Sequence, residues 1–207
     1  MRKALIITII GIIILITCKP VDTEKFDKET YTDNKFKDKN FLIIAQLQNE
    51  RNTTELIKWL DNKNPAYREA AGIAFGSVQD TLAITNLFKL LETDQSIRVR
   101  SAAAFAIGQS GDSTSEARLL IYSLKEKSEK VKELVFEAIG KCGTKSGHEF
   151  LLEQLTNNPG RPNIGILSGL GRLSIRGIIT EAGLIKMLDL IGDQTQNDEN
   201  RFIASIY

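Results

Sequence analysis

Apolar residues recur along most of the chain at the three- and four-residue spacing of an amphipathic helix, and four helical segments end on a similar phrase. Each phrase combines small or apolar residues with a closing glycine, as in REAAGIAFG and RSAAAFAIG; the fourth, NIGILSGLG, is the weakest. The closing glycines are Gly76, Gly108, Gly140 and Gly171, which lie 32, 32 and 31 residues apart. A period in this range predicts an all-α array of stacked helical hairpins.

Each repeat is predicted to contain two helices. The phrase forms the first helix, and its alanines allow a neighbouring helix to approach closely. We expect the closing glycine to end this helix as a left-handed cap, because glycine adopts positive φ without steric cost. Asp80, Asp112 and Thr144 follow at the place where a polar residue would cap a leucine-rich second helix.

The array is predicted to occupy residues 41–207, with atypical hairpins at both ends. Residues 41–47 and 53–60 form a divergent first hairpin, as expected of a capping repeat. Residues 178–191 form a second helix, and residues 201–207 begin another first helix that has no closing glycine. Half a hairpin leaves an apolar surface uncovered, so we expect the array to be incomplete at its C-terminus.

The first eighteen residues are predicted to be a signal peptide. Two basic residues precede an apolar run over residues 4–17, which leads to Cys18. As a helix this run would span about 21 Å, less than the hydrocarbon layer of about 30 Å, so a stable membrane span is disfavoured. The ending LITC resembles the bacterial lipobox and implies lipidation of Cys18, although Thr17 stands where that pattern prefers Gly, Ala or Ser. An ordinary signal peptide and an uncleaved anchor are the alternatives. In each case the protein leaves the cytoplasm, and lipidation of Cys18 places it in the bacterial cell envelope, facing the periplasm or the exterior.

Residues 19–40 alternate acidic and basic side chains and contain few apolar residues. Such a segment cannot bury enough apolar surface to order itself, so it predicts a tether between the membrane and the array. Its aromatic residues Phe26, Tyr31 and Phe36 offer an alternative, in which the segment docks on the first repeat.

Charge and composition exclude several functions. The chain of 207 residues has 27 basic and 26 acidic residues spread along its length, which disfavours nucleic acid as the main partner. One histidine and two cysteines leave too few ligands for a metal site, and no cofactor motif is present. Cys142 is predicted to be a small helix-end residue and His148 an exposed or partly buried helix residue, so no catalytic residue is expected.

The repeated phrase resembles the HEAT repeat, in the short bacterial form shared with the phycocyanobilin-lyase group. The resemblance covers about residues 41–207 and implies a right-handed α-solenoid, a HEAT/armadillo-like superhelix that acts as a scaffold without catalysis. The positions that match the family pattern are the basic residues Arg68, Arg100 and Lys132 and the acidic residues Asp80 and Asp112. We predict that these form a structural ladder of ion pairs between repeats.

The fourth repeat departs from the period. Four glycines replace bulkier helix formers beside two arginines: Gly165, Gly169, Gly171 and Gly177, with Arg172 and Arg176. Close helix packing, a seam to another domain and a binding site each explain the change.

The sequence therefore predicts a scaffold for a protein partner, tethered to a membrane through Cys18. Residues 64–79 also resemble the N-terminal array of secreted Bacteroidota lipoproteins that continue into a cyclophilin-type peptidyl-prolyl isomerase domain. That resemblance implies the alternative of an accessory array for an isomerase. A bilin-lyase-like enzyme ranks third, because no catalytic residue supports it.

Overall fold

The computed structural model describes residues 37–111, 113–157, 163–193, 195–205 and 207, and these residues form helices without any strand. Cys18, Asp112 and the predicted tether as far as residue 36 lie outside the described residues. The helices are α3 (Lys39–Asn49), α4 (Thr53–Leu60), α5 (Pro65–Val78), η2 (Thr81–Ala83), α6 (Ile84–Thr93), α7 (Ile97–Ser110), η3 (Ser113–Ser115), α8 (Glu116–Ser123), α9 (Glu129–Cys142), α10 (Lys145–Asn157), α11 (Ile164–Ile175), α12 (Glu181–Gly192) and α13 (Asp198–Ala204).

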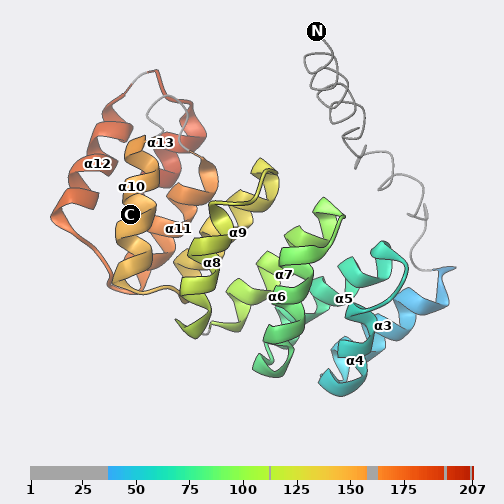
Figure 1. Ribbon diagram of the computed structural model, residues 1–207. Coiled ribbons are helices and arrows are strands. Elements are labelled where there is room, and N and C mark those ends of the chain that lie inside the picture. Colours follow the sequence, from blue (N-terminus) through green and yellow to red (C-terminus); the bar gives the residue numbers. More distant parts are fainter. Residues whose placement is uncertain (1–36, 112, 158–162, 194, 206) are drawn as a thin grey trace, which may run out of the picture.

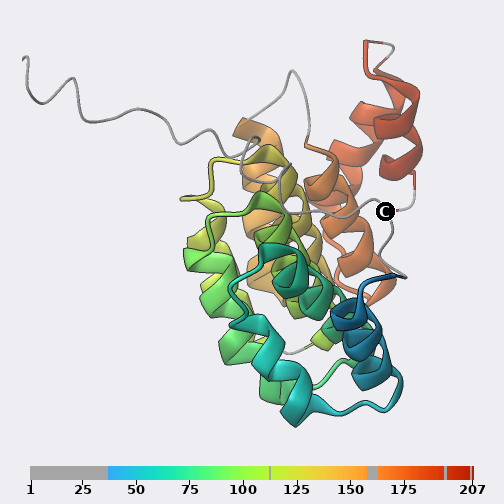
Figure 2. The same ribbon diagram turned by 90° about the vertical axis from the view of Figure 1, so that its right-hand side faces the viewer.

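The helices form the predicted solenoid of stacked hairpins. The first helices α3, α5, α7, α9, α11 and α13 follow one another in one row, and the second helices α4, α6, α8, α10 and α12 form the other, as Figures 1 and 2 show. Each first helix packs against the first helix of the next repeat. In the part of the chain that the structure describes, no helix combines the length and the apolar character needed to cross a bilayer.

Polar residues cap several helices, and the predicted cap at Asp80 is confirmed. The Asn64 side chain accepts a hydrogen bond from the Ala66 amide at 2.9 Å at the start of α5, and Asp80 accepts from Leu82 at 2.9 Å at the start of η2. Helix α3 begins at Lys39, two residues before its predicted start, because Asp38 caps it by accepting from Asn40 at 2.8 Å. The last residues of the predicted tether therefore belong to the array.

The closing glycines are not left-handed caps, and this prediction is wrong. Gly76, Gly108, Gly140 and Gly171 lie inside their helices. Positive φ occurs three residues after the first two of them, at Gln79 (55°) and Gly111 (67°).

Glycine is required at these positions because neighbouring first helices touch there. A Cβ on Gly140 would lie 2.3 Å from the Gly169 carbonyl oxygen, and one on Gly76 would lie 2.2 Å from the Phe105 ring. The closing glycines of the repeated phrase therefore allow the first helices to pack closely.

Two glycines of the fourth repeat, Gly165 and Gly169, serve the same packing. A Cβ on Gly165 would lie 2.2 Å from the Glu133 carbonyl oxygen, and one on Gly169 would lie 2.5 Å from that of Phe136. These contacts place the backbone of α11 directly against α9. Only Gly177 acts as a left-handed cap among these glycines, with φ of 80° at the end of α11.

One apolar core runs through all the repeats. Its second-helix members recur with the period of 32 residues, as Leu87, Leu119 and Leu151 show, and all three are fully buried. Solenoids bury their apolar surface only between neighbours, so this continuous core holds the rows of helices in register.

Candidate functional site

Arg68 and Arg100 form ion pairs that stabilise the turns leading from one repeat to the next. Arg68 Nε lies 2.6 Å from Asp94 Oδ2, and Arg100 Nε lies 2.9 Å from Glu126 Oε2. Asp94 also accepts a hydrogen bond from the Ser96 amide, as Glu126 does from Ser128. Each arginine therefore orders an acidic turn and the start of the following helix.

The acidic partners differ from the predicted ones. Asp80 lies beyond the opposite end of α5 from Arg68, about 20 Å along the helix axis, and its carboxylate accepts from Thr53 Oγ1 at 2.5 Å instead. Lys132 pairs with Glu129 of its own helix at 2.9 Å, so it extends no ladder. The sequence pattern that would have identified the partners is an acidic residue 26 positions after Arg68 and after Arg100.

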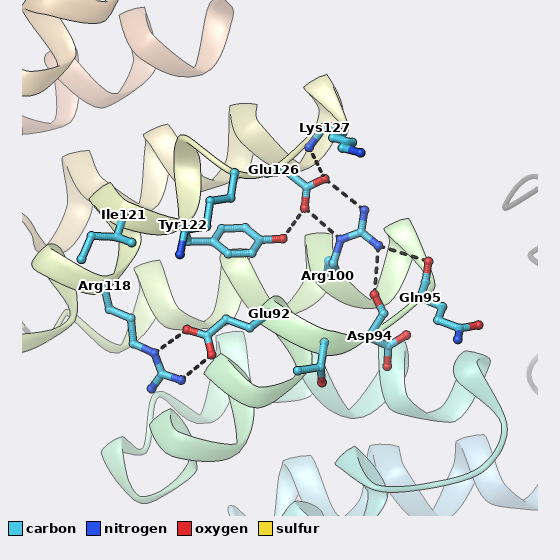
Figure 3. Close-up of a pocket in the computed structure, with 11 residues that line it drawn as sticks. Glu92, Asp94, Gln95, Arg100, Arg118, Ile121, Tyr122, Glu126 and Lys127 are labelled. Atoms are coloured by element: carbon cyan, nitrogen blue, oxygen red, sulfur yellow. Dashed lines mark hydrogen bonds and ion pairs between the residues drawn. The ribbon is translucent and has the colours of Figure 1, made fainter. Parts of the chain in front are cut away.

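An open groove of about 630 Å³ lies between α6 and α8. At one end, Arg118 of α8 forms a bidentate ion pair with Glu92 of α6. Its Nε lies 2.5 Å from Glu92 Oε1, and its Nη2 lies 2.6 Å from Glu92 Oε2. At the other end lies the Arg100–Glu126 pair, and Figure 3 shows the Tyr122 ring between the two pairs. The charged walls are thus held rigidly by side chains from three successive helices.

The pKa values in the groove keep its charges fixed near neutral pH. Burial alone would raise the pKa of Glu126, but hydrogen bonds from Arg100, Tyr122 and the Ser128 amide hold it below its usual value. Burial, together with the hydrogen bond from its hydroxyl to Glu126, raises the pKa of Tyr122. Glu126 is therefore an anion and Tyr122 a neutral donor.

The rim of the groove carries uncompensated positive charge. The carboxylates that line it, Glu92, Asp94 and Glu126, are each paired with an arginine. Lys125 and Lys127 also line it, are exposed, and form no ion pair within the described residues. An acidic group entering the groove would therefore meet two available cations.

Glu116 is a buried structural carboxylate that the sequence did not reveal. It lies on α8 and accepts hydrogen bonds from the Thr144 amide at 2.6 Å, the Thr144 hydroxyl at 2.8 Å and the Gly147 amide at 2.7 Å. The carboxylate thus caps the N-terminus of α10 from another helix. No local pattern distinguishes it from a surface glutamate.

His148 is completely buried, so its predicted exposure is wrong. Its Nε2 lies 2.6 Å from the Tyr207 hydroxyl, which also accepts from the Thr180 amide at 3.2 Å. Tyr207 therefore covers the His148 ring. Cys142 is buried on the last turn of α9, as predicted, where its thiol donates to the Ala138 carbonyl. Among the described residues, no three His, Cys, Asp or Glu side chains gather as a metal site would require.

The sequence profile described as HEAT repeats matches residues 42–108 and 84–164, which together span more than half of the chain. The chain belongs to the HEAT-repeat family. No curated protein matches the sequence. HEAT repeats generally mediate protein interactions, so the surfaces that the helices present to a partner are the candidate sites.

Proposed function

We propose that this HEAT-repeat protein is an interaction scaffold of the cell envelope, tethered to a membrane by lipid on Cys18, and that it holds a partner protein in the α6–α8 groove. The observation that carries the proposal is the groove itself, an open hollow with ordered charged walls. Such a surface suits a polypeptide segment, because backbone amides and charged side chains can both find partners there.

The rigid walls favour binding. Arg118 is held by Glu92 and also lies 4.3 Å from the centre of the Phe88 ring, so its position is set before any partner arrives. Side chains that are already ordered lose little conformational entropy on binding.

The alternative is an accessory array that presents polypeptide clients to a peptidyl-prolyl isomerase domain. The resemblance of residues 64–79 to such lipoproteins supports it. Both functions use the same groove, but an accessory array would bind unfolded chains of many sequences, whereas a scaffold would bind one partner.

Photo-crosslinking in the native cells tests the proposed function. A benzophenone amino acid replaces Ile121, at the groove, or Ile73, an exposed residue on first helix α5. We expect a discrete adduct band from position 121 and none from position 73. Equal adducts from both positions, or none from position 121, would refute a partner at the groove, and a broad smear from position 121 alone would favour the isomerase alternative.

The membrane tether is tested by the substitution Cys18→Ala. Several acyl chains make membrane attachment lasting, so the wild-type protein should fractionate with membranes and the variant should be released. A variant that stays with the membranes would indicate an uncleaved anchor instead.

A further inference from the structure

Exposed apolar residues interrupt the polar face of the second helices at α8 and again at α12. Ile121 of α8 and Leu124, the residue that follows its last turn, are 58% and 67% exposed, and together they form what we name the α8 ridge. Ile121 borders the α6–α8 groove, whereas Leu124 borders a second hollow of about 330 Å³ that α9 and α10 also line. The ridge thus separates two hollows in the middle of the array.

The ridge differs from the second helices on either side of it. The residues 32 positions before Ile121 and Leu124 are Lys89 and Glu92 of α6, and those 32 positions after them are Glu153 and Thr156 of α10. A further 32 positions on, an apolar pair recurs as Ile185 and Leu188 of α12, which are 54% and 67% exposed. The buried leucines of these helices keep the same spacing, so the positions are equivalent.

The fold does not require apolar residues at the ridge. Lys89 and Glu92 instead form ion pairs with the neighbouring second helices, with Asp61 at 2.7 Å and Arg118 at 2.5 Å. Exposed apolar side chains gain stability only when something covers them.

From the exposed ridge and the two cations beside it, and on the basis of the proposed function, we infer that the α8 ridge is the anchor point for an acidic segment of a partner protein with large apolar side chains at its centre. The apolar side chains would cover Ile121 and Leu124. The acidic residues would meet Lys125 and Lys127, the uncompensated cations that follow the ridge in sequence. Charge complementarity therefore selects an acidic segment over a basic one.

A random peptide library displayed on phage, selected against the full chain, tests this inference. We expect enriched peptides to combine Asp or Glu with Leu, Ile or Phe. The double variant Ile121→Lys, Leu124→Glu carries the residues that α6 has at these positions, so its melting temperature should match that of the wild type. Its affinity for an enriched peptide should fall about tenfold or more, as for an interface hot spot.

Two further variants make the test specific. Leu188→Glu removes an equally exposed leucine, also 67%, from second helix α12 and should leave peptide affinity unchanged. The pair Lys125→Glu, Lys127→Glu should weaken binding and reduce its dependence on salt.

Basic or unbiased peptides, or an equal loss in Leu188→Glu, would overturn the inference. So would a wild-type chain that dimerises in sedimentation while the ridge variant stays monomeric, because the ridge would then bind a second copy. If the crosslink from position 121 succeeds and the peptides fail, only this inference fails and the proposed function stands. If the crosslink fails, the proposed function fails.

Discussion

At the scale of single residues, the structure separates two roles that the repeated phrase combines. The glycines allow first helices to touch, and the arginines order the turns between repeats. Both roles depend on neighbours from other helices, so their energetic importance differs among residues that look alike in sequence.

The first prediction concerns Gly140. A methyl group there would press on the Gly169 backbone, which cannot move aside as a flexible side chain could. We expect Gly140→Ala to destabilise the protein by about 2 kcal/mol or more, as overpacking does. Gly192→Ala is the control, because a methyl group there would meet no atom of another helix or side chain within 4 Å, and it should cost nothing. Equal denaturant midpoints for the two variants would contradict the close packing of α9 and α11.

The second prediction compares two carboxylates of the groove. Glu126→Ala leaves Arg100 without its partner in a pair whose side chains are 4% and 16% exposed, so it should cost about 3 kcal/mol. Glu92→Ala breaks the more exposed pair with Arg118 and should cost less than about 1 kcal/mol. Chemical denaturation measures both losses of stability. A larger loss for Glu92→Ala would contradict the assignment of the Arg100–Glu126 pair as the more buried of the two.

Sequence reasoning succeeded at the residues whose role is local and failed at those whose role is distant. Asp80, predicted as a helix cap, accepts a hydrogen bond from the amide two residues later, and its short polar side chain indicates this role directly. Arg68 instead pairs with Asp94, which lies 26 residues later in the sequence and comes close only when the hairpins stack. The groove could not be predicted, because it is formed by side chains of three helices.

At the scale of helices, α10 depends on two buried contacts from elsewhere in the chain. Glu116 of α8 caps its N-terminus, and Tyr207 covers His148 on its first turns. The second helix of this repeat therefore connects the middle of the array to its C-terminal end.

The third prediction is a pH dependence that originates at His148. Burial lowers its pKa, while nearby Glu149 raises it and Lys145 lowers it further. The unfolded chain therefore takes up a proton at about pH 6.5, whereas the folded chain stays neutral to lower pH. Stability from this group is present above about pH 6.5 and is lost as the pH falls below it.

Thermal melts at several pH values between neutral and mildly acidic test this sign. The wild-type melting temperature should fall more steeply on acidification than that of His148→Gln, which carries no titrating ring. Parallel curves for the two proteins would contradict the buried, neutral histidine.

At the scale of the whole molecule, the period of the glycines was sufficient to predict the solenoid, because each repeat can bury its apolar surface only against its neighbours. The same period also reveals exceptions, because α8 and α12 carry exposed apolar pairs at positions that are polar in α6 and α10. The positions of Ile121 and Leu124 are polar in the second helices before and after them. Of the two pairs, the one at α8 adjoins the groove that we propose holds a partner.

Hydrogen exchange of the full chain, with and without the protein crosslinked at position 121, tests this account most directly. Binding at the groove should slow amide exchange in residues 84–93 and 116–127 and leave the first-helix residues 65–78 unchanged. Protection confined to the first helices, or to residues 181–204 at the C-terminal end, would contradict the assignment of the α6–α8 groove as the binding surface.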